Sequence, residues 1–280
     1  MRVGFSNNTD SFIIDELKFK ISQNYSQVIF CDQILDNYPD NAILYSSNKD
    51  GEFLPDYVQL LGCKIDPNIL KKLRNDNIRV CSISSLVSDD FTNVINNFVI
   101  SKNLDHSNVK FGIIGLGEIG YNLSNKLVQN NFQVYYSDIA YRNQSYLNPK
   151  IRRLTLDLLL SRCDFISIHV RLGPTSKSLI SHRELNLIKD NAILINLSED
   201  LLFDQSQKNV LEDLRLKDRY LTLENFPNRD KILSLQNSDI VNFILNNLDK
   251  YINNIPLLST IEYIDYPYTG DPSFWSSKMI

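Results

Sequence analysis

Three glycines near the middle of the chain have a spacing that can bring the polypeptide backbone against a phosphate group. They form the motif Gly115-x-Gly117-x-x-Gly120, which follows an apolar run over residues 109–114. Gly115 permits a tight turn, Gly117 lets the backbone approach a pyrophosphate, and Gly120 lets a helix pack closely on the preceding strand. Apolar residues then recur at helical spacing, so the stretch predicts a strand, a glycine turn and a helix. The residues expected at this turn are Gly115, Gly117, Glu118, Ile119 and Gly120.

An aspartate follows at the distance where a ribose would lie. A second apolar run over residues 132–136 leads to Asp138, twenty-one residues after Gly117. A carboxylate at that position can accept a hydrogen bond from a ribose 2′-hydroxyl. An aspartate that only capped a turn or a helix would not explain this spacing. We therefore expect the site to bind NAD, with Asp138 repelling the 2′-phosphate of NADP.

The elements that position these residues alternate between strands and helices, which predicts α/β domains with parallel sheets. Before the glycine motif, strands are expected at residues 3–5, 28–31, 42–46, 57–61 and 78–81, and helices at 11–23 and around 69–73. After it, strands are expected at 132–136, 164–170, 192–197 and 220–223. Helices are expected at 154–160, from the capping box of Ser181 and Glu184, after Asp204, and at 238–251. The polar residues 101–108 connect the two units.

Composition narrows the class of protein. The chain has 280 residues, of which 43% are hydrophobic and 22% charged, which fits one large or two ordinary globular domains. Its net charge of −4 provides no basic stripe for nucleic acid. The apolar runs are too short to span a membrane, and the N-terminus begins like a strand and not like a signal peptide. The expectation is a soluble, cytoplasmic protein without nucleic-acid or membrane partners.

The four cysteines are scattered along the chain without a C-x-x-C pair. This pattern favours free thiols over a disulfide framework or a zinc site. No metal site is expected.

The order of these motifs resembles the D-2-hydroxyacid dehydrogenase family, which includes formate, D-lactate and phosphoglycerate dehydrogenases. Residues 111–120 resemble its nucleotide turn, and residues 163–170 resemble a later strand that usually ends His-Val-Pro-Leu. Residues 172–180, 184–189 and 192–196 are similar to the helix and strand that follow, and 62–66 faintly resemble a glycine-rich substrate loop. The resemblance implies NAD as cofactor, with His169, Val170 and Asn196 beside it.

The same resemblance implies how the domains divide. It predicts a Rossmann-type doubly wound NAD domain over residues 99–263. It predicts a smaller flavodoxin-like substrate domain over residues 1–98, with residues 264–280 as a candidate completion. Fewer residues separate the two domains than the family uses for its dimer-forming arm, so a homodimer is left open.

The residues implied for the family's chemistry differ here. The family holds its substrate carboxylate with an arginine three residues after the position of Asn196, and this chain has Glu199 there. The catalytic histidine is expected in a Pro-His pair, where this chain has Pro267-Tyr268, and the sequence contains no histidine after His182. The family also has an acid that orients the histidine, and the best placement of that position in this chain is Arg229. A carboxylate substrate would be repelled by Glu199.

Each of these positions has a functional and a structural interpretation. His169 is a surviving base or a hydrogen-bonded structural histidine. Tyr268 donates a proton, with its pKa lowered by Lys64 or Arg171, or it fills the space of the missing histidine. Glu199 is a base, a binder of a cationic substrate, or a solvated carboxylate.

Two hypotheses follow for the whole protein. One is an NAD-dependent oxidoreductase with a non-standard small-molecule substrate, whose catalytic candidates are Tyr268, Glu199 and Lys64. The other is a catalytically inactive relative that acts as a nucleotide-binding scaffold or sensor.

Overall fold

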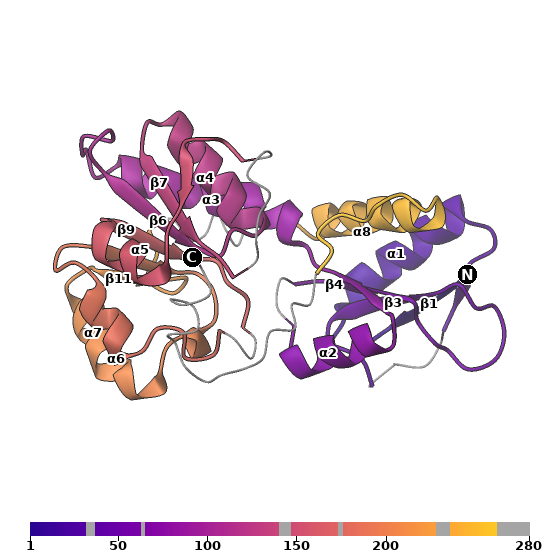
Figure 1. Cartoon of the computed structure of the whole chain (residues 1–280). Coiled ribbons are helices and arrows are strands. Elements are labelled where there is room, and N and C mark those ends of the chain that lie inside the picture. Colours follow the sequence, from indigo (N-terminus) through magenta and orange to yellow (C-terminus); the bar gives the residue numbers. More distant parts are fainter. Residues whose placement is uncertain (32–36, 63–64, 140–146, 173–175, 228–235, 262–280) are drawn as a thin grey trace. The chain divides into compact units, whose positions relative to one another are not determined.

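The computed structural model describes residues 1–31, 37–62, 65–139, 147–172, 176–227 and 236–261. Within these ranges the chain folds into two compact units, each with its own β-sheet (Figure 1). The first unit comprises Met1–Val87 with the described part of Ser234–Ile264, and the second comprises the described part of Ser88–Leu233. Both units combine strands with helices, so the predicted α/β fold class is confirmed.

The second unit contains a six-stranded sheet in which neighbouring strands are parallel. In spatial order they are β11 (Tyr220–Thr222), β10 (Ile193–Asn196), β9 (Phe165–Ile168), β6 (Lys110–Ile114), β7 (Gln133–Ser137) and β8 (Ile151–Arg153). From β6 the chain proceeds through β7 to β8 on one side, and from β9 it proceeds through β10 to β11 on the other. The order therefore reverses between β6 and β9. This is the predicted doubly wound, Rossmann-type sheet.

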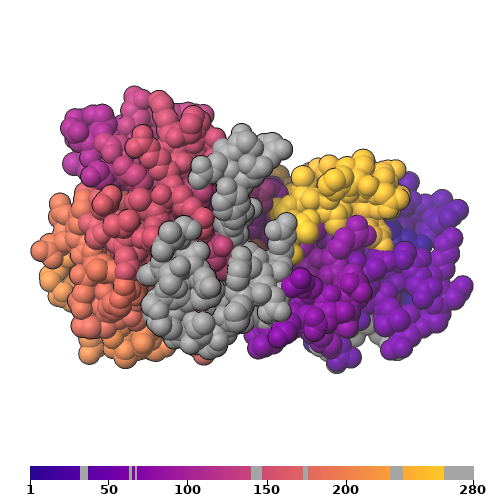
Figure 2. Space-filling view, viewed as in Figure 1, coloured from indigo at the N-terminus to yellow at the C-terminus, as the bar shows by residue number. Residues whose placement is uncertain are grey.

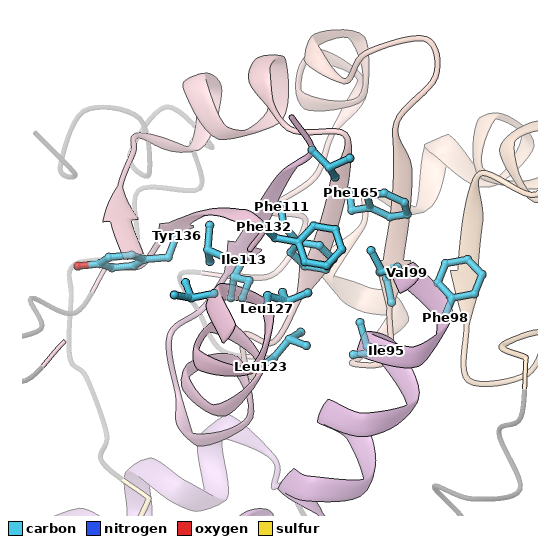
Figure 3. Packing of buried hydrophobic residues seen from close by; sticks show 14 of the residues in the cluster. Ile95, Phe98, Val99, Phe111, Ile113, Leu123, Leu127, Phe132, Tyr136 and Phe165 are labelled. Carbon is cyan, nitrogen blue, oxygen red and sulfur yellow. The ribbon is translucent and has the colours of Figure 1, made fainter. Parts of the chain in front are cut away.

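Helices cover both faces of this sheet, because successive side chains along a strand point to opposite faces. Phe111 and Ile113 of β6 pack with α3 (Ser84–Ile100) and α4 (Glu118–Gln129), as Figure 3 shows. Ile114 belongs to the core on the other face, with α5 (Leu156–Arg162) and α6 (His182–Leu187). Side chains of α7 (Lys208–Leu216) pack against that second core. Strand β6 is thus buried between two helical layers.

The compact units divide the chain differently from the predicted ranges 1–98 and 99–263. The division falls between Val87 and Ser88, inside α3, a helix that the sequence reading did not predict. The C-terminal part of α3 belongs to the second unit because Val94, Ile95 and Val99 pack into the core of that unit. Helix α8 (Asn237–Ile252) belongs to the first unit. Residues 264–280, the candidate completion of the first domain, lie outside the described residues.

The first unit contains a five-stranded mixed sheet, and here the prediction of a parallel sheet is wrong for one strand. The order is β2 (Ile29–Phe30), β1 (Arg2–Phe5), β3 (Ala42–Ser46), β4 (Tyr57–Leu60) and β5 (Arg79–Cys81). Strand β3 is antiparallel to both β1 and β4, whereas β1 pairs with β2, and β4 with β5, in parallel. Residues 47–56, which join β3 to β4, contain no helix. A parallel pair needs a longer crossover, so this short connection requires antiparallel strands.

Helices also cover both faces of the smaller sheet. Helices α1 (Ser11–Asn24) and α8 pack on one face, and α2 (Pro67–Asn75) packs on the other. The outward face of α8 forms part of the surface of the first unit (Figure 2). On its inner face, the buried Asn247 donates from Nδ2 to Oε1 of Gln59 (2.8 Å) and accepts from the amide of Leu258 (2.8 Å). These bonds join α8 to β4 and to the segment after the helix.

Two further expectations concern cysteines and membranes. Cys31, Cys81 and Cys163 are free thiols, as predicted, and Cys63 lies outside the described residues. Burial raises the pKa of Cys81 to about 11 and that of Cys163 to about 12, so both thiols stay protonated and unreactive.

Among the helices of the described ranges, none is long and apolar enough to cross a membrane.

We expect Asn247→Ala to lower the free energy of unfolding of the first unit by about 1–3 kcal/mol, because it removes the buried bond to Gln59 and leaves the partly buried backbone groups of Leu258 without this partner. Asn246→Ala is the matched control, since Asn246 is exposed on the same helix and gains the same helix propensity. Urea unfolding, with hydrogen exchange of the β4 amides, measures both variants. Equal stability of the two variants would contradict the placement of α8.

Candidate nucleotide-binding site

The predicted cofactor residues lie at one edge of the six-stranded sheet. Gly115 follows β6, Asp138 follows β7 and His169 follows β9, while Asn196 is the last residue of β10. Because these strands are parallel, their carboxyl ends share an edge. The edge includes the switch point between β6 and β9, where ligands bind in open α/β sheets.

Gly115 forms the tight turn that the sequence predicts. Its φ of +93° lies in a region that L side chains rarely adopt. A Cβ atom there would also lie 2.8 Å from the amide nitrogen of Val170 and 2.9 Å from the carbonyl carbon of His169. The turn is thus pressed against the end of β9, and both conformation and space require glycine.

Gly120 and Gly117 are glycines for different reasons. A Cβ on Gly120 would lie 2.2 Å from the main-chain oxygen of Gly115, so this glycine lets α4 approach the turn. Among the described residues, a Cβ on Gly117 would meet nothing within 4 Å, and its φ of −72° suits any residue. Protein packing therefore does not explain Gly117. Open space beside the N-cap of α4 fits the predicted approach of a pyrophosphate to a helix N-terminus.

Asp138 joins the glycine turn to the end of β7. Its side chain is buried, and its Oδ2 atom accepts a hydrogen bond of 2.7 Å from the amide of Leu116. The main-chain oxygen of Asp138 accepts a hydrogen bond of 3.0 Å from Nη2 of Arg153 on β8. The carboxylate is therefore held against the turn that would carry the nucleotide phosphates.

Glu118 and Ile119 begin helix α4. The Glu118 side chain is exposed in the first turn, where a carboxylate interacts favourably with the helix dipole. That carboxylate has the same charge sign as a pyrophosphate, so Glu118 would contribute its backbone amide and not its side chain. Ile119 is half-buried between the two glycines.

His169 is a hydrogen-bonded histidine at the end of β9. Its Nε2 atom lies 2.8 Å from Oγ of the buried Ser167, and its amide donates to the Ile114 carbonyl oxygen (2.8 Å). Burial lowers the pKa of His169 to about 4, so the imidazole is neutral near pH 7. These contacts favour the structural interpretation over the catalytic base. Val170 supplies the atoms against which the Gly115 turn packs.

Asn196 and Glu199 shape the loop after β10. The buried Asn196 donates to the Tyr220 hydroxyl (3.2 Å) and accepts from the amide of Ser198 (3.1 Å). The hydroxyl of Ser198 donates to the main-chain oxygen of Ile168, which ties this loop to β9. Glu199 is half-buried as the N-cap of a short 3-10 helix, Asp200–Leu202. It therefore lies at the same edge of the sheet as the glycine turn.

The remaining catalytic candidates are not placed. Lys64 and Tyr268 lie outside the described residues, as does Arg229 at the position of the orienting acid, so their roles stay predictions. Arg171 is exposed, and its main-chain oxygen accepts from the hydroxyl of Ser176 (2.7 Å). Within the described ranges, no group of three or more potential ligand side chains could hold a metal ion.

Sequence reasoning missed two contributors to this edge. The amide of Leu116 is a main-chain group, and no side-chain type marks it in the sequence. Arg153 lies on β8, a three-residue edge strand with a single apolar residue, Ile151. The one available signal was the pair of arginines after Ile151, which precedes the expected helix.

The parallel sheet, its switch point and the glycine turn define the second unit as a dinucleotide-binding α/β domain. Residues 94–217 match the family model described as D-isomer specific 2-hydroxyacid dehydrogenase, NAD binding domain. This segment is therefore similar to the NAD-binding domain of that family.

Similarity to individual relatives covers a limited part of the sequence. The D-3-phosphoglycerate dehydrogenase of Haemophilus influenzae is 37% identical over 95 residues, which are 34% of this chain and 23% of that protein. The glyoxylate reductase of Thermococcus litoralis is 32% identical over 93 residues, which are 33% of this chain and 28% of that protein. The matched part is therefore a minor part of either relative.

Similarity of fold extends further. A D-isomer specific 2-hydroxyacid dehydrogenase family protein from Klebsiella pneumoniae has a TM-score of 0.61 at 12% identity, over 94% of this chain and 97% of that one. A family member from Xanthobacter autotrophicus, in complex with NADPH and MES, has a TM-score of 0.61 at 13% identity, over 92% and 97%. At these identities the likeness concerns the fold alone.

We expect Gly117→Ala and Gly120→Ala to separate nucleotide binding from folding. Gly117→Ala should lower the free energy of unfolding by about 1 kcal/mol or less, since its methyl group meets no described atom and alanine is only a poorer N-cap than glycine. It should nevertheless weaken NADH binding by about tenfold or more, because that space is where the pyrophosphate would approach. Gly120→Ala should destabilise the fold by about 2 kcal/mol or more, because its methyl group overlaps the Gly115 oxygen.

Thermal unfolding and fluorescence titration with NADH measure the two effects. A Gly117→Ala variant that folds and binds NADH like the unmodified protein would contradict this assignment.

Proposed function

We propose that the chain binds NAD(H) at the carboxyl edge of the six-stranded sheet and acts as an oxidoreductase-like protein with altered chemistry. The observation that carries the nucleotide proposal is the glycine turn. Gly115 and Gly120 are required by the fold, whereas no atom of the described residues would contact a Cβ on Gly117, at the N-terminus of α4. The close approach of a bound pyrophosphate would explain why residue 117 is a glycine. The match of residues 94–217 to the family's NAD-binding domain supports the same cofactor class.

The altered chemistry rests on residue types at the expected catalytic positions. Glu199 follows β10 at the edge where a substrate would meet the cofactor, and its carboxylate would repel a 2-hydroxy acid. A hydride leaves a hydroxyl carbon only if a base also takes the hydroxyl proton. His169 is poorly suited to that task, because its pKa of about 4 makes it a weak base. If the protein is an enzyme, its substrate is therefore neutral or cationic near Glu199.

A second candidate function is a nucleotide-binding scaffold or sensor without catalysis. The sequence contains no histidine after His182, and His182 itself is the first residue of α6, near Gln207. The loss of the family's histidine and arginine leaves the nucleotide turn intact. A domain that binds NAD(H) without turning it over would have this pattern.

We expect NADH to bind at least about tenfold more tightly than NADPH, because the Asp138 carboxylate repels a 2′-phosphate. Asp138→Asn should narrow this preference, since the amide oxygen still accepts from Leu116 while the negative charge is gone. Calorimetric titration of both proteins with both nucleotides measures the ratio. An equal or inverted preference in the unmodified protein would rule out the role of Asp138.

Reduction of pyruvate, glyoxylate and hydroxypyruvate by NADH should be negligible, because each carries the carboxylate that Glu199 repels. Glu199→Gln should not restore it, since removing the negative charge does not provide a cation or a base. The assay follows NADH absorbance at saturating nucleotide. Robust turnover of any of these acids would contradict the proposed change in chemistry.

A further inference from the structure

The side chains of Ser167 and His169 form a hydrogen-bonded pair on one face of strand β9. Residues two apart along a strand point to the same face, and the pairing of Ser167 with Ile113 places that face toward helix α4. The amide of His169 donates to the Ile114 carbonyl oxygen, which continues the pairing of β9 with β6. His169 therefore lies beside the glycine turn, on the side of the sheet that α4 covers.

The Ser167 hydroxyl determines which nitrogen of the imidazole carries the proton. This hydroxyl is buried, and within the described ranges its one hydrogen-bond partner is Nε2 of His169, at 2.8 Å. If it only accepted from Nε2, its own proton would be buried without an acceptor, which is costly. The hydroxyl therefore donates to Nε2. Because burial lowers the pKa of His169 to about 4, the ring is neutral near pH 7 and its single proton is on Nδ1.

The Nδ1 atom of His169 is accessible to a ligand. Among the contacts of the described residues it has no hydrogen-bond partner, and it does not belong to the buried polar atoms that lack one. The side chain is half-buried at the carboxyl edge of the sheet, next to the turn expected to hold a pyrophosphate. An N–H donor at this place suits a phosphate oxygen, since hydrogen bonds to ionised acceptors are stronger than those between neutral groups.

We propose that Ser167 is a positioning residue that fixes His169 in the tautomer with its proton on Nδ1, and that this N–H donates to the pyrophosphate of the bound dinucleotide. The inference rests on the proposed function, because it requires the nucleotide to bind at the glycine turn. His169 then serves the site as a neutral hydrogen-bond donor and not as a base. Ser167 acts through His169, by keeping the proton off Nε2.

Nitrogen-15 NMR of the histidine-labelled full chain tests the tautomer without any nucleotide. The sequence contains three histidines, so the ring signals can be assigned by substituting them one at a time. His106 is an internal reference, because its Nδ1 lies 3.1 Å from the carbonyl oxygen of Asn130, which can only accept. At about pH 8, where an ordinary imidazole is neutral, His169 should show the same pattern, with the proton on Nδ1. Ser167→Ala should give a mixture of both tautomers. A proton on Nε2 in the unmodified protein would overturn the proposal.

Titration with NADH and ADP-ribose compares two substitutions of His169, after circular dichroism has established that each variant is folded. An asparagine side-chain nitrogen is as many bonds from the backbone as Nδ1, and a glutamine nitrogen as many as Nε2. His169→Asn should therefore keep the NADH affinity within about threefold, whereas His169→Gln should weaken it by about tenfold, which corresponds to about 1.4 kcal/mol. ADP-ribose has the pyrophosphate without the nicotinamide, so it should weaken by the same factor. His182→Gln, on the exposed first residue of α6, is the control and should change neither ligand.

A purely structural role for His169 predicts the reverse order. If His169→Gln keeps the affinity and His169→Asn loses it, the bond to Ser167 alone matters and the proposal is wrong. If His169→Gln weakens NADH but not ADP-ribose, the donor does not contact the pyrophosphate and the proposal is also wrong. Both results would leave the proposed NAD(H) site standing. If the unmodified protein binds neither ligand, the proposed function and this contact fail together.

Discussion

The structure of the second unit depends on the close packing of strand β6 and the turn after it against β9, α4 and α5. A Cβ on Gly112 would lie 2.6 Å from a methyl carbon of Leu159 and 2.9 Å from the sulfur of Cys163, so helix α5 presses directly on the strand. At the end of β6, Gly115 packs against β9 and Gly120 brings α4 onto the turn. The absence of three side chains thus fixes the distances between the central strand, its neighbour and two helices. The candidate site is a consequence of this packing, because β9 and α4 hold Gly115 and Gly120 at either end of the glycine turn.

The groups expected to bind the nucleotide and the candidate catalytic residue Glu199 lie in different segments of the second unit. The turn, the Leu116 amide and Asp138 form a unit whose geometry is set by the backbone, and such a unit does not depend on which catalytic side chains surround it. Glu199 lies in a different loop, held to β9 through Ser198. A substitution in that loop therefore leaves the contacts of the nucleotide turn in place.

The sequence predicted the parts of the fold in which local pattern and tertiary structure agree. Strand β9 is a continuous apolar run, and the capping box of Ser181 and Glu184 begins α6 as expected. Three features had weak or misleading signals. The direction of β3 depends on the length of its connections, the membership of α3 depends on which core buries its apolar side, and β8 is too short to show a period. The contact between Asp138 and the Leu116 amide could not be predicted, because one partner is main chain.

The central claim is that a dinucleotide lies over the glycine turn with its adenosine ribose at Asp138. A crystal structure of the full chain with NADH bound tests it most directly. The account predicts pyrophosphate oxygens beside the backbone of Gly117 at the start of α4, and a ribose hydroxyl donating to the Asp138 carboxylate. A nucleotide bound elsewhere on the protein, or a ribose that faces away from Asp138, would contradict it.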